Sequence, residues 1–199
     1  MKSLLYILYV IITSSTYLFG QYNYEVNKEN PFGKLNPAAT PKTAEFALLI
    51  GECKCKSQMR APDKTWNEEV DVIWRWKYIM NGMAVQDETL KADGVHSGSI
   101  RQYNADSLKW YVHYYTSSNV PSSLPVWEGS KSEDGKIILY REQVAPNGTD
   151  GFLRLTFYNI TNKGFNWISE WVNIDETFSY PTWKINCTKM KSKNYYYEN

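Results

Sequence analysis

An excess of charge of either sign is absent from this sequence, which has 22 Lys and Arg residues against 21 Asp and Glu residues. The formal net charge is +1, and both signs are scattered along the chain. Nucleic acids and anionic membranes attract proteins through a strong positive field, which this balance does not create. We therefore expect no nucleic-acid partner. The basic end of the chain is interpreted as a last strand followed by a frayed tail over residues 192–199.

Motifs for catalysis, metal binding and cofactor binding are also missing. His96 and His113 have neither the spacing of a metal-binding helix nor an evident carboxylate partner. The sequence has no glycine-rich phosphate loop, nucleophile elbow or P-loop. These observations favour a protein without catalytic residues, metal or cofactor. A small isomerase or hydrolase that uses Glu or Tyr is kept as an alternative.

Cysteine is scarce, with three residues in the chain, and this number favours one disulfide and one free thiol in an exported protein. Cys53 and Cys55 are two positions apart, so on a strand they share a face and cannot easily bond to each other. Cys187 falls in the last predicted strand, which a closed barrel places beside the first. We predict a disulfide between Cys187 and either Cys53 or Cys55. A thiolate metal site would lack a fourth ligand.

An apolar run long enough to span a bilayer is not found either. Leu4 to Ile12 follows Lys2 and is broken by a polar stretch at Thr13 to Thr16, which is typical of a signal peptide. We predict a signal peptide over residues 1–20, a disordered leader over residues 21–40, and a secreted or periplasmic protein without a membrane span after cleavage. An uncleaved membrane anchor is the alternative.

The sequence does have a regular alternation of apolar and polar side chains. In the stretch EVDVIWRWKYIM, the residues Val70, Val72, Trp74, Trp76 and Tyr78 fall on one side of an extended strand. The same period of two returns in LKWYVHYYT, GKIILYREQV, FLRLTFYNI and FNWISEWVNI. This pattern predicts a long antiparallel sheet rich in aromatic residues.

Turn residues divide the sheet into about ten predicted strands and leave one helix signal before them. Thr40 suits an N-cap, Pro41 the first helical position and Gly51 the position past the end. The strands are expected over residues 52–59, 66–80, 83–91, 98–103, 108–117, 125–130, 135–144, 151–160, 165–173 and 183–189. The turns are short and the sequence gives no sign of helical crossovers. We therefore predict one all-β domain over residues 41–191, an up-and-down antiparallel barrel of the lipocalin-like kind that begins with a short helix. A two-sheet sandwich is the main competitor.

Three arginines within strands suggest a polar function for the barrel interior. Arg154 shares a face with Phe152, Thr156 and Tyr158, and Arg141 shares one with Ile137, Leu139 and Gln143, while Arg101 is a third candidate. An inward charge is costly unless it meets a carboxylate or an anionic ligand. The alternative is that these arginines pair with Glu170, Glu142 or Glu69 in a polar network, or that they face water. The loops at Thr116 to Leu124 and Asp175 to Thr182 are expected to form the rim of a cavity.

The order of several motifs resembles a bacterial lipocalin-like family of unknown function, within the calycin group of ligand-binding barrels. The matching pieces are FALLIGE at Phe46, WRWKYIMNGMAVQDE at Trp74, GSIRQYNADSLKWYVHY at Gly98, GFLRLTFYNITNKGFNWISEW at Gly151 and TWKI at Thr182. The family has tryptophan soon after Leu-x-Gly, whereas this chain has Cys53. The resemblance implies a calycin-like barrel whose cavity is lined by Trp74, Arg101, Trp110, Arg154 and Trp167.

Together these features lead to two hypotheses of different kinds. The first is an exported, non-enzymatic protein that buries a small hydrophobic or amphipathic ligand among aromatic faces, with an arginine to orient an anionic group. The second is a barrel without a cavity that acts as a scaffold through its rim loops. A cavity smaller than about 300 Å³ would favour the second hypothesis.

Overall fold

A computed structural model of the chain describes residues 22–191. The predicted signal peptide and the predicted frayed tail lie outside these described residues. Among residues 22–191, no helix is long and apolar enough to cross a membrane.

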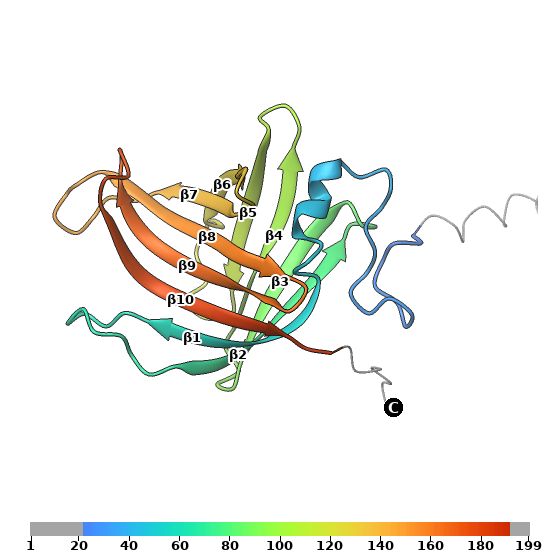
Figure 1. The fold of residues 1–199 in the computed structure, drawn as a ribbon, viewed down its shortest axis with the longest axis horizontal. Coiled ribbons are helices and arrows are strands. Elements are labelled where there is room, and N and C mark those ends of the chain that lie inside the picture. Colours follow the sequence, from blue (N-terminus) through green and yellow to red (C-terminus); the bar gives the residue numbers. More distant parts are fainter. Residues whose placement is uncertain (1–21, 192–199) are drawn as a thin grey trace, which may run out of the picture.

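Ten antiparallel strands form one closed barrel in the order β1-β10-β9-β8-β7-β6-β5-β4-β3-β2, and each strand pairs with its neighbours in sequence (Figure 1). Sequence neighbours pair because short turns join them, and the pairing of β1 with β10 closes the ring. This arrangement confirms the predicted all-β barrel and excludes the sandwich. The strands are β1 (Gly51–Met59), β2 (Val70–Ile79), β3 (Ala84–Lys91), β4 (His96–Asn104), β5 (Lys109–Thr116), β6 (Val126–Lys131), β7 (Ile137–Glu142), β8 (Gly151–Thr161), β9 (Gly164–Asn173) and β10 (Ser179–Lys189).

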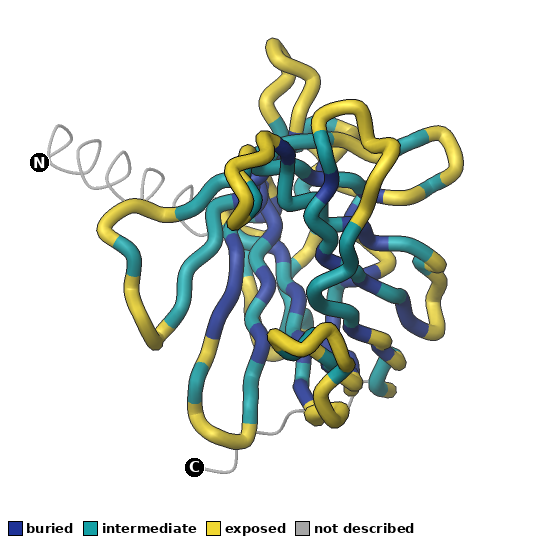
Figure 2. The backbone as a smooth tube through the Cα atoms, turned by 90° about the vertical axis from the view of Figure 1, so that its left-hand side faces the viewer, coloured by how far each residue is buried: buried dark blue, intermediate teal, exposed yellow. Residues whose placement is uncertain are grey.

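Side chains alternate between the interior and the outside of the barrel, as the sequence pattern predicts. In β2 the residues Val72, Trp74, Trp76 and Tyr78 are buried, whereas Val70, at the start of the strand, is exposed. Figure 2 shows that buried positions follow the strands and that exposed positions gather in the connecting loops. The barrel interior is therefore the hydrophobic core of the domain.

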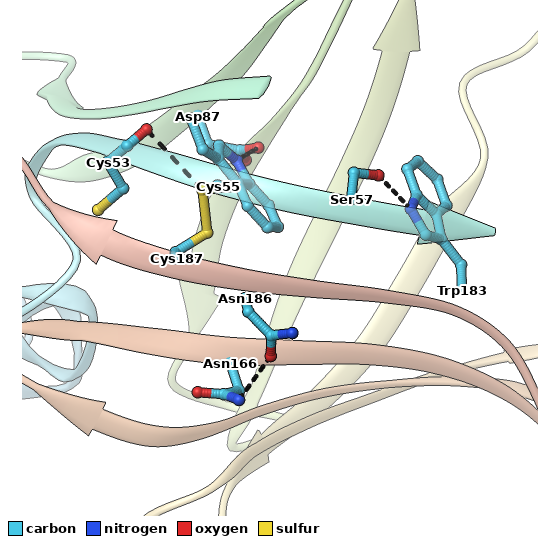
Figure 3. The surroundings of a disulfide bond; sticks show 9 residues. Cys53, Cys55, Ser57, Asp87, Asn166, Trp183, Asn186 and Cys187 are labelled. Carbon is cyan, nitrogen blue, oxygen red and sulfur yellow. Dashed lines mark hydrogen bonds between the residues drawn. A yellow bond between two sulfur atoms is a disulfide. The ribbon is translucent and has the colours of Figure 1, made fainter. Parts of the chain in front are cut away.

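The seam between the first and last strands is closed by a disulfide between Cys55 and Cys187 (Figure 3). The two residues are direct partners in the ladder between β1 and β10, with their Cα atoms 4.1 Å apart. The predicted bond is thus confirmed, and Cys55 is the half-cystine. Cys53 lies on the same inward face as a free thiol, and burial raises its pKa.

One end of the barrel, hereafter the closed end, is covered by the 3-10 helix η1 (Pro41–Phe46) and the turn that follows it. Phe46 is fully buried, and its ring lies 4.8 Å from the ring of Trp110 and 5.8 Å from that of Trp76. Leu49 is also fully buried. Pro41 begins the helix as predicted, although the side chain of Thr40 makes no capping hydrogen bond. Aromatic packing against the barrel therefore holds the helix in place.

The predicted disordered leader is corrected by the structure. Residues 22–40 form a series of turns at the closed end of the barrel. They make hydrogen bonds to the β2–β3 hairpin. The backbone N–H of Tyr78 donates to the carbonyl of Phe32, and that of Asn36 donates to the carbonyl of Gly82. The Asn81 side chain accepts from the backbone of Tyr24 at 3.1 Å. The backbone of this segment thus pairs with the β2–β3 hairpin, which composition alone does not reveal.

Candidate functional site

A cavity of about 340 Å³ occupies the half of the barrel that lies away from η1. Its lining comes from inward positions of nine strands together with Pro125, which precedes β6. The chain reaches this open end at the β1–β2, β3–β4, β5–β6, β7–β8 and β9–β10 loops. The two loops predicted as rims, at Thr116 to Leu124 and Asp175 to Thr182, lie at this end, although residues 179–182 of the second belong to β10. The open end of the barrel is therefore the candidate site.

Aromatic rings form much of the cavity wall. Trp167 lies between Trp74 and Trp183, with ring centroids 6.0 Å and 5.2 Å away, and both contacts are edge-on. On the other side, Tyr114 meets Trp127 edge-on at 6.2 Å. Such contacts fix the rings in a definite arrangement, and the same rings line the cavity.

The deepest polar group of the cavity is a buried ion pair between Arg101 and Asp87. Arg101 lies in the half of β4 nearer the closed end, and both side chains are almost completely buried. The indole N–H of Trp74 donates to the second carboxylate oxygen of Asp87 at 2.7 Å. Both carboxylate oxygens thus have a partner, as a buried charge requires.

Arg101 is held in place by aromatic rings as well as by Asp87. Its guanidinium lies 4.4 Å from the ring centroid of Trp76 and 5.4 Å from that of Phe46. Burial lowers the pKa of Arg101 to about 9, so the side chain still carries its charge at neutral pH. Because Asp87 neutralises this charge locally, the ion pair forms a polar but nearly neutral inner end of the cavity, which is called its floor below.

Hydroxyl groups line the wall above this floor. The hydroxyls of Thr89 and Ser97 bond to each other at 2.5 Å across β3 and β4. Ser169 bonds to Thr182 at 3.2 Å. Ser99 also lines the cavity, and its hydroxyl has no side-chain hydrogen bond among residues 22–191. These hydroxyls can therefore form hydrogen bonds with a polar group of a ligand, while the tryptophan side chains keep the rest of the wall apolar.

Arg141 is the charged group nearest the open end. It lies one residue before the end of β7, and its guanidinium stacks 4.4 Å from the ring centroid of Trp127. Its one side-chain hydrogen bond is to the Gln143 amide oxygen, at 3.4 Å. No carboxylate of the part of the chain that the structure describes forms an ion pair with it. Burial lowers the pKa of Arg141, since the charge loses part of its hydration.

Three of the five predicted lining residues do line the cavity, namely Trp74, Arg101 and Trp167. Trp110 does not, and this is a correction. It is fully buried at the closed end, beside Phe46, and its indole N–H donates to Glu45 in η1 at 2.9 Å. Because the helix occupies the space that Trp110 faces, this residue anchors the helix.

Arg154 is a second correction, because it lies on the outer face of the barrel. Its guanidinium pairs with Glu170 of β9 at 2.9 Å and with Glu176 of the β9–β10 loop. The inward positions of β8 are Leu153, Leu155 and Phe157. The expectation that a glutamate partners this arginine is confirmed at Glu170. The inward face of β8 carries no charged side chain, and this absence of charge was a signal for the interior that alternation alone does not give.

Two tryptophans of the wall, Trp127 and Trp183, were not singled out from the sequence. Trp127 lies in the short strand β6, and Trp183 lies beside a register shift in β10, so alternation does not identify the inward face at either position. Arg141, in contrast, shares its predicted face with Ile137 and Leu139, which are fully buried. That aliphatic face correctly places Arg141 inside.

Comparisons with known proteins do not show a family or a function for this chain. No family model matches the sequence, and no curated protein matches it. The crystal structure of Rv2717c from M. tuberculosis is a structural neighbour with a TM-score of 0.48 and 11% sequence identity. The match covers 77% of this chain and 99% of that chain. The lipocalin-like resemblance thus stays a prediction, and function has to be argued from the cavity itself.

Proposed function

We propose that this protein is a non-enzymatic binding protein that holds a small, partly apolar ligand in the open half of its barrel. The observation that carries the proposal is the cavity of about 340 Å³ between tryptophan side chains. Small-molecule sites are usually concave, apolar spaces of about 300–1,000 Å³ with a few fixed polar groups. The Asp87–Arg101 pair and the nearby hydroxyls supply such groups. The volume lies just above the limit below which a scaffold would be favoured.

We further infer an exported protein, and the disulfide supports this inference. Disulfides persist in oxidising compartments and are rare in the cytosol. The bond between Cys55 and Cys187 also closes the wall around the cavity.

Native mass spectrometry of the full chain, as purified and again after reduction, tests the proposal directly. We expect an added mass on the folded protein that is lost on denaturation. As a second test, isothermal titration measures binding of 2-naphthylmethanol, a neutral bicyclic probe. If the chain carries no added mass and does not bind this probe, the binding function is wrong.

Filling part of the cavity should weaken binding of the probe. Ser99→Leu places an apolar side chain in the space, and the lost hydroxyl leaves no side-chain partner unpaired among the described residues. Gln102→Leu is the matched control, because Gln102 is exposed on the outer face of the same strand. We expect weaker binding by the first variant and unchanged binding by the second. Equal binding by both would place the probe outside the barrel.

A further inference from the structure

We infer that the ligand of this cavity is a compact aromatic carboxylate whose charged group binds Arg141 at the open end. The inference rests on the proposed binding function and specifies the chemical class of the ligand. Three features of the cavity carry it, namely its net charge, its size and the shape of its walls.

The charge of the lining favours an anion. The lining residues include two arginines, Arg101 and Arg141, and one carboxylate, Asp87. Asp87 forms its ion pair with Arg101, deep in the barrel. The positive charge of Arg141 is therefore left over within the lining. A half-buried guanidinium forms stronger hydrogen bonds with an anion than with a neutral group. Arginine presents a planar fork of donors that matches the two oxygens of a carboxylate.

The position of Arg141 sets the direction of the ligand. It lies at the open end of β7, stacked on Trp127, whereas the other charges lie deep in the barrel. A carboxylate at Arg141 would keep contact with water while the rest of the ligand extends inward. The Ser99 hydroxyl and the bonded pair of Thr89 and Ser97 can meet a second polar atom of the ligand.

The size and shape of the cavity favour a ring over a long alkyl chain. At about 30 Å³ for each non-hydrogen atom, as in liquid water, the cavity holds roughly eleven such atoms. This suits one or two fused rings and is too small for a long fatty acid. Trp74, Trp167 and Trp183 line the cavity as a wall of rings fixed by edge-on contacts, against which an aromatic ring can pack.

The test compares three probes by isothermal titration with the full chain at pH 7, namely 2-naphthoate, its neutral analogue 2-naphthylmethanol, and decanoate. We expect 2-naphthoate to bind most tightly. Arg141→Gln should weaken 2-naphthoate binding roughly tenfold or more, as loss of a hydrogen-bonded charge does, and leave 2-naphthylmethanol binding unchanged. Arg141→Lys should recover part of the loss, since it restores the charge without the planar fork.

Arg154→Gln is the matched control, because it removes the same group from the outer face of the neighbouring strand. It should leave the binding of all three probes unchanged. If 2-naphthoate binds no better than the neutral analogue, or if Arg141→Gln does not weaken it, the anionic class is wrong while the binding function stands. Tighter binding of decanoate would overturn the aromatic class. Absence of binding by all three probes would contradict the binding function itself.

Discussion

The two ends of this barrel are built from the same ten strands but are filled in different ways. At the closed end, Phe46 and Leu49 enter the barrel and leave no exposed surface on themselves or on Trp76 and Trp110. At the open end, inward positions of β3, β4 and β9 carry Thr89, Ser97, Ser99 and Ser169. Small hydroxyl side chains there leave the space between the tryptophans unfilled.

The difference shows that alternation determines which residues point inward, while side-chain size determines whether the interior is packed. Tightly packed interiors lose stability when atoms are removed, whereas the lining of a cavity has already lost those contacts on one side. Substitutions of the same kind should therefore have different effects at the two ends.

The largest effect is expected from Leu49→Ala at the closed end. We expect the free energy of unfolding to fall by about 3–5 kcal/mol, because a fully buried leucine is replaced and a void is left behind. Urea unfolding followed by tryptophan fluorescence measures the change. Leu48→Ala is the control, since its side chain is about half exposed and should cost much less. Equal losses for the two variants would show that the turn after η1 does not seal the barrel.

Removal of the disulfide should come next. The double variant Cys55→Ala with Cys187→Ala opens a loop closed across a sequence separation of 132 residues. We expect the free energy of unfolding to fall by about 2–4 kcal/mol, because the unfolded chain gains freedom. Cys53→Ala removes a buried thiol without removing a cross-link and should cost less. Amide hydrogen exchange in β1 and β10 would show whether one end of the seam opens first. Identical exchange rates in the double variant and the unchanged protein would argue against a stabilising role for the disulfide.

Leu155→Ala is the counterpart of Leu49→Ala at the open end. The same atoms are removed, but Leu155 already borders the cavity. We expect a loss of about 1–2 kcal/mol in urea unfolding, below the usual range for a packed leucine. A loss as large as that of Leu49→Ala would mean that the open end is as well packed as the closed end.

The smallest effect is expected from Ser99→Leu, which adds atoms to the open end. Because the added side chain enters existing space, the free energy of unfolding should change by less than about 1 kcal/mol, whereas overpacking of a filled core costs about 1–3 kcal/mol. Thermal unfolding of the ligand-free protein measures the change. A larger loss would contradict the presence of space beside Ser99.

Much of this fold was predictable because alternation is a local property. The run from Val72 to Tyr78 identified a strand and its inward face without any knowledge of its neighbours. The strand ends were less predictable. Residues 66–69, expected in β2, lie in the preceding loop except for an isolated bridge between Arg60 and Trp66.

The site was less predictable because it depends on register between strands. The choice of Cys55 over Cys53 follows from the ladder in which Cys55 faces Cys187 and Cys53 faces Lys189. Arg154 was misplaced because both faces of β8 carry apolar side chains, so that period two alone does not say which face is inside. Trp110 was misplaced because the helix that covers it is far away in sequence.

Closure of the barrel at one end has a consequence for how molecules would exchange. In the part of the chain that the structure describes, η1 leaves the loops of the opposite end as the route to the interior. A bound molecule would then have to dissociate before a second molecule could bind. Two competing ligands would therefore not occupy the cavity together during exchange. Residence time would be governed by how often those loops part, and a substitution in a loop could change both rates while leaving the equilibrium affinity untouched.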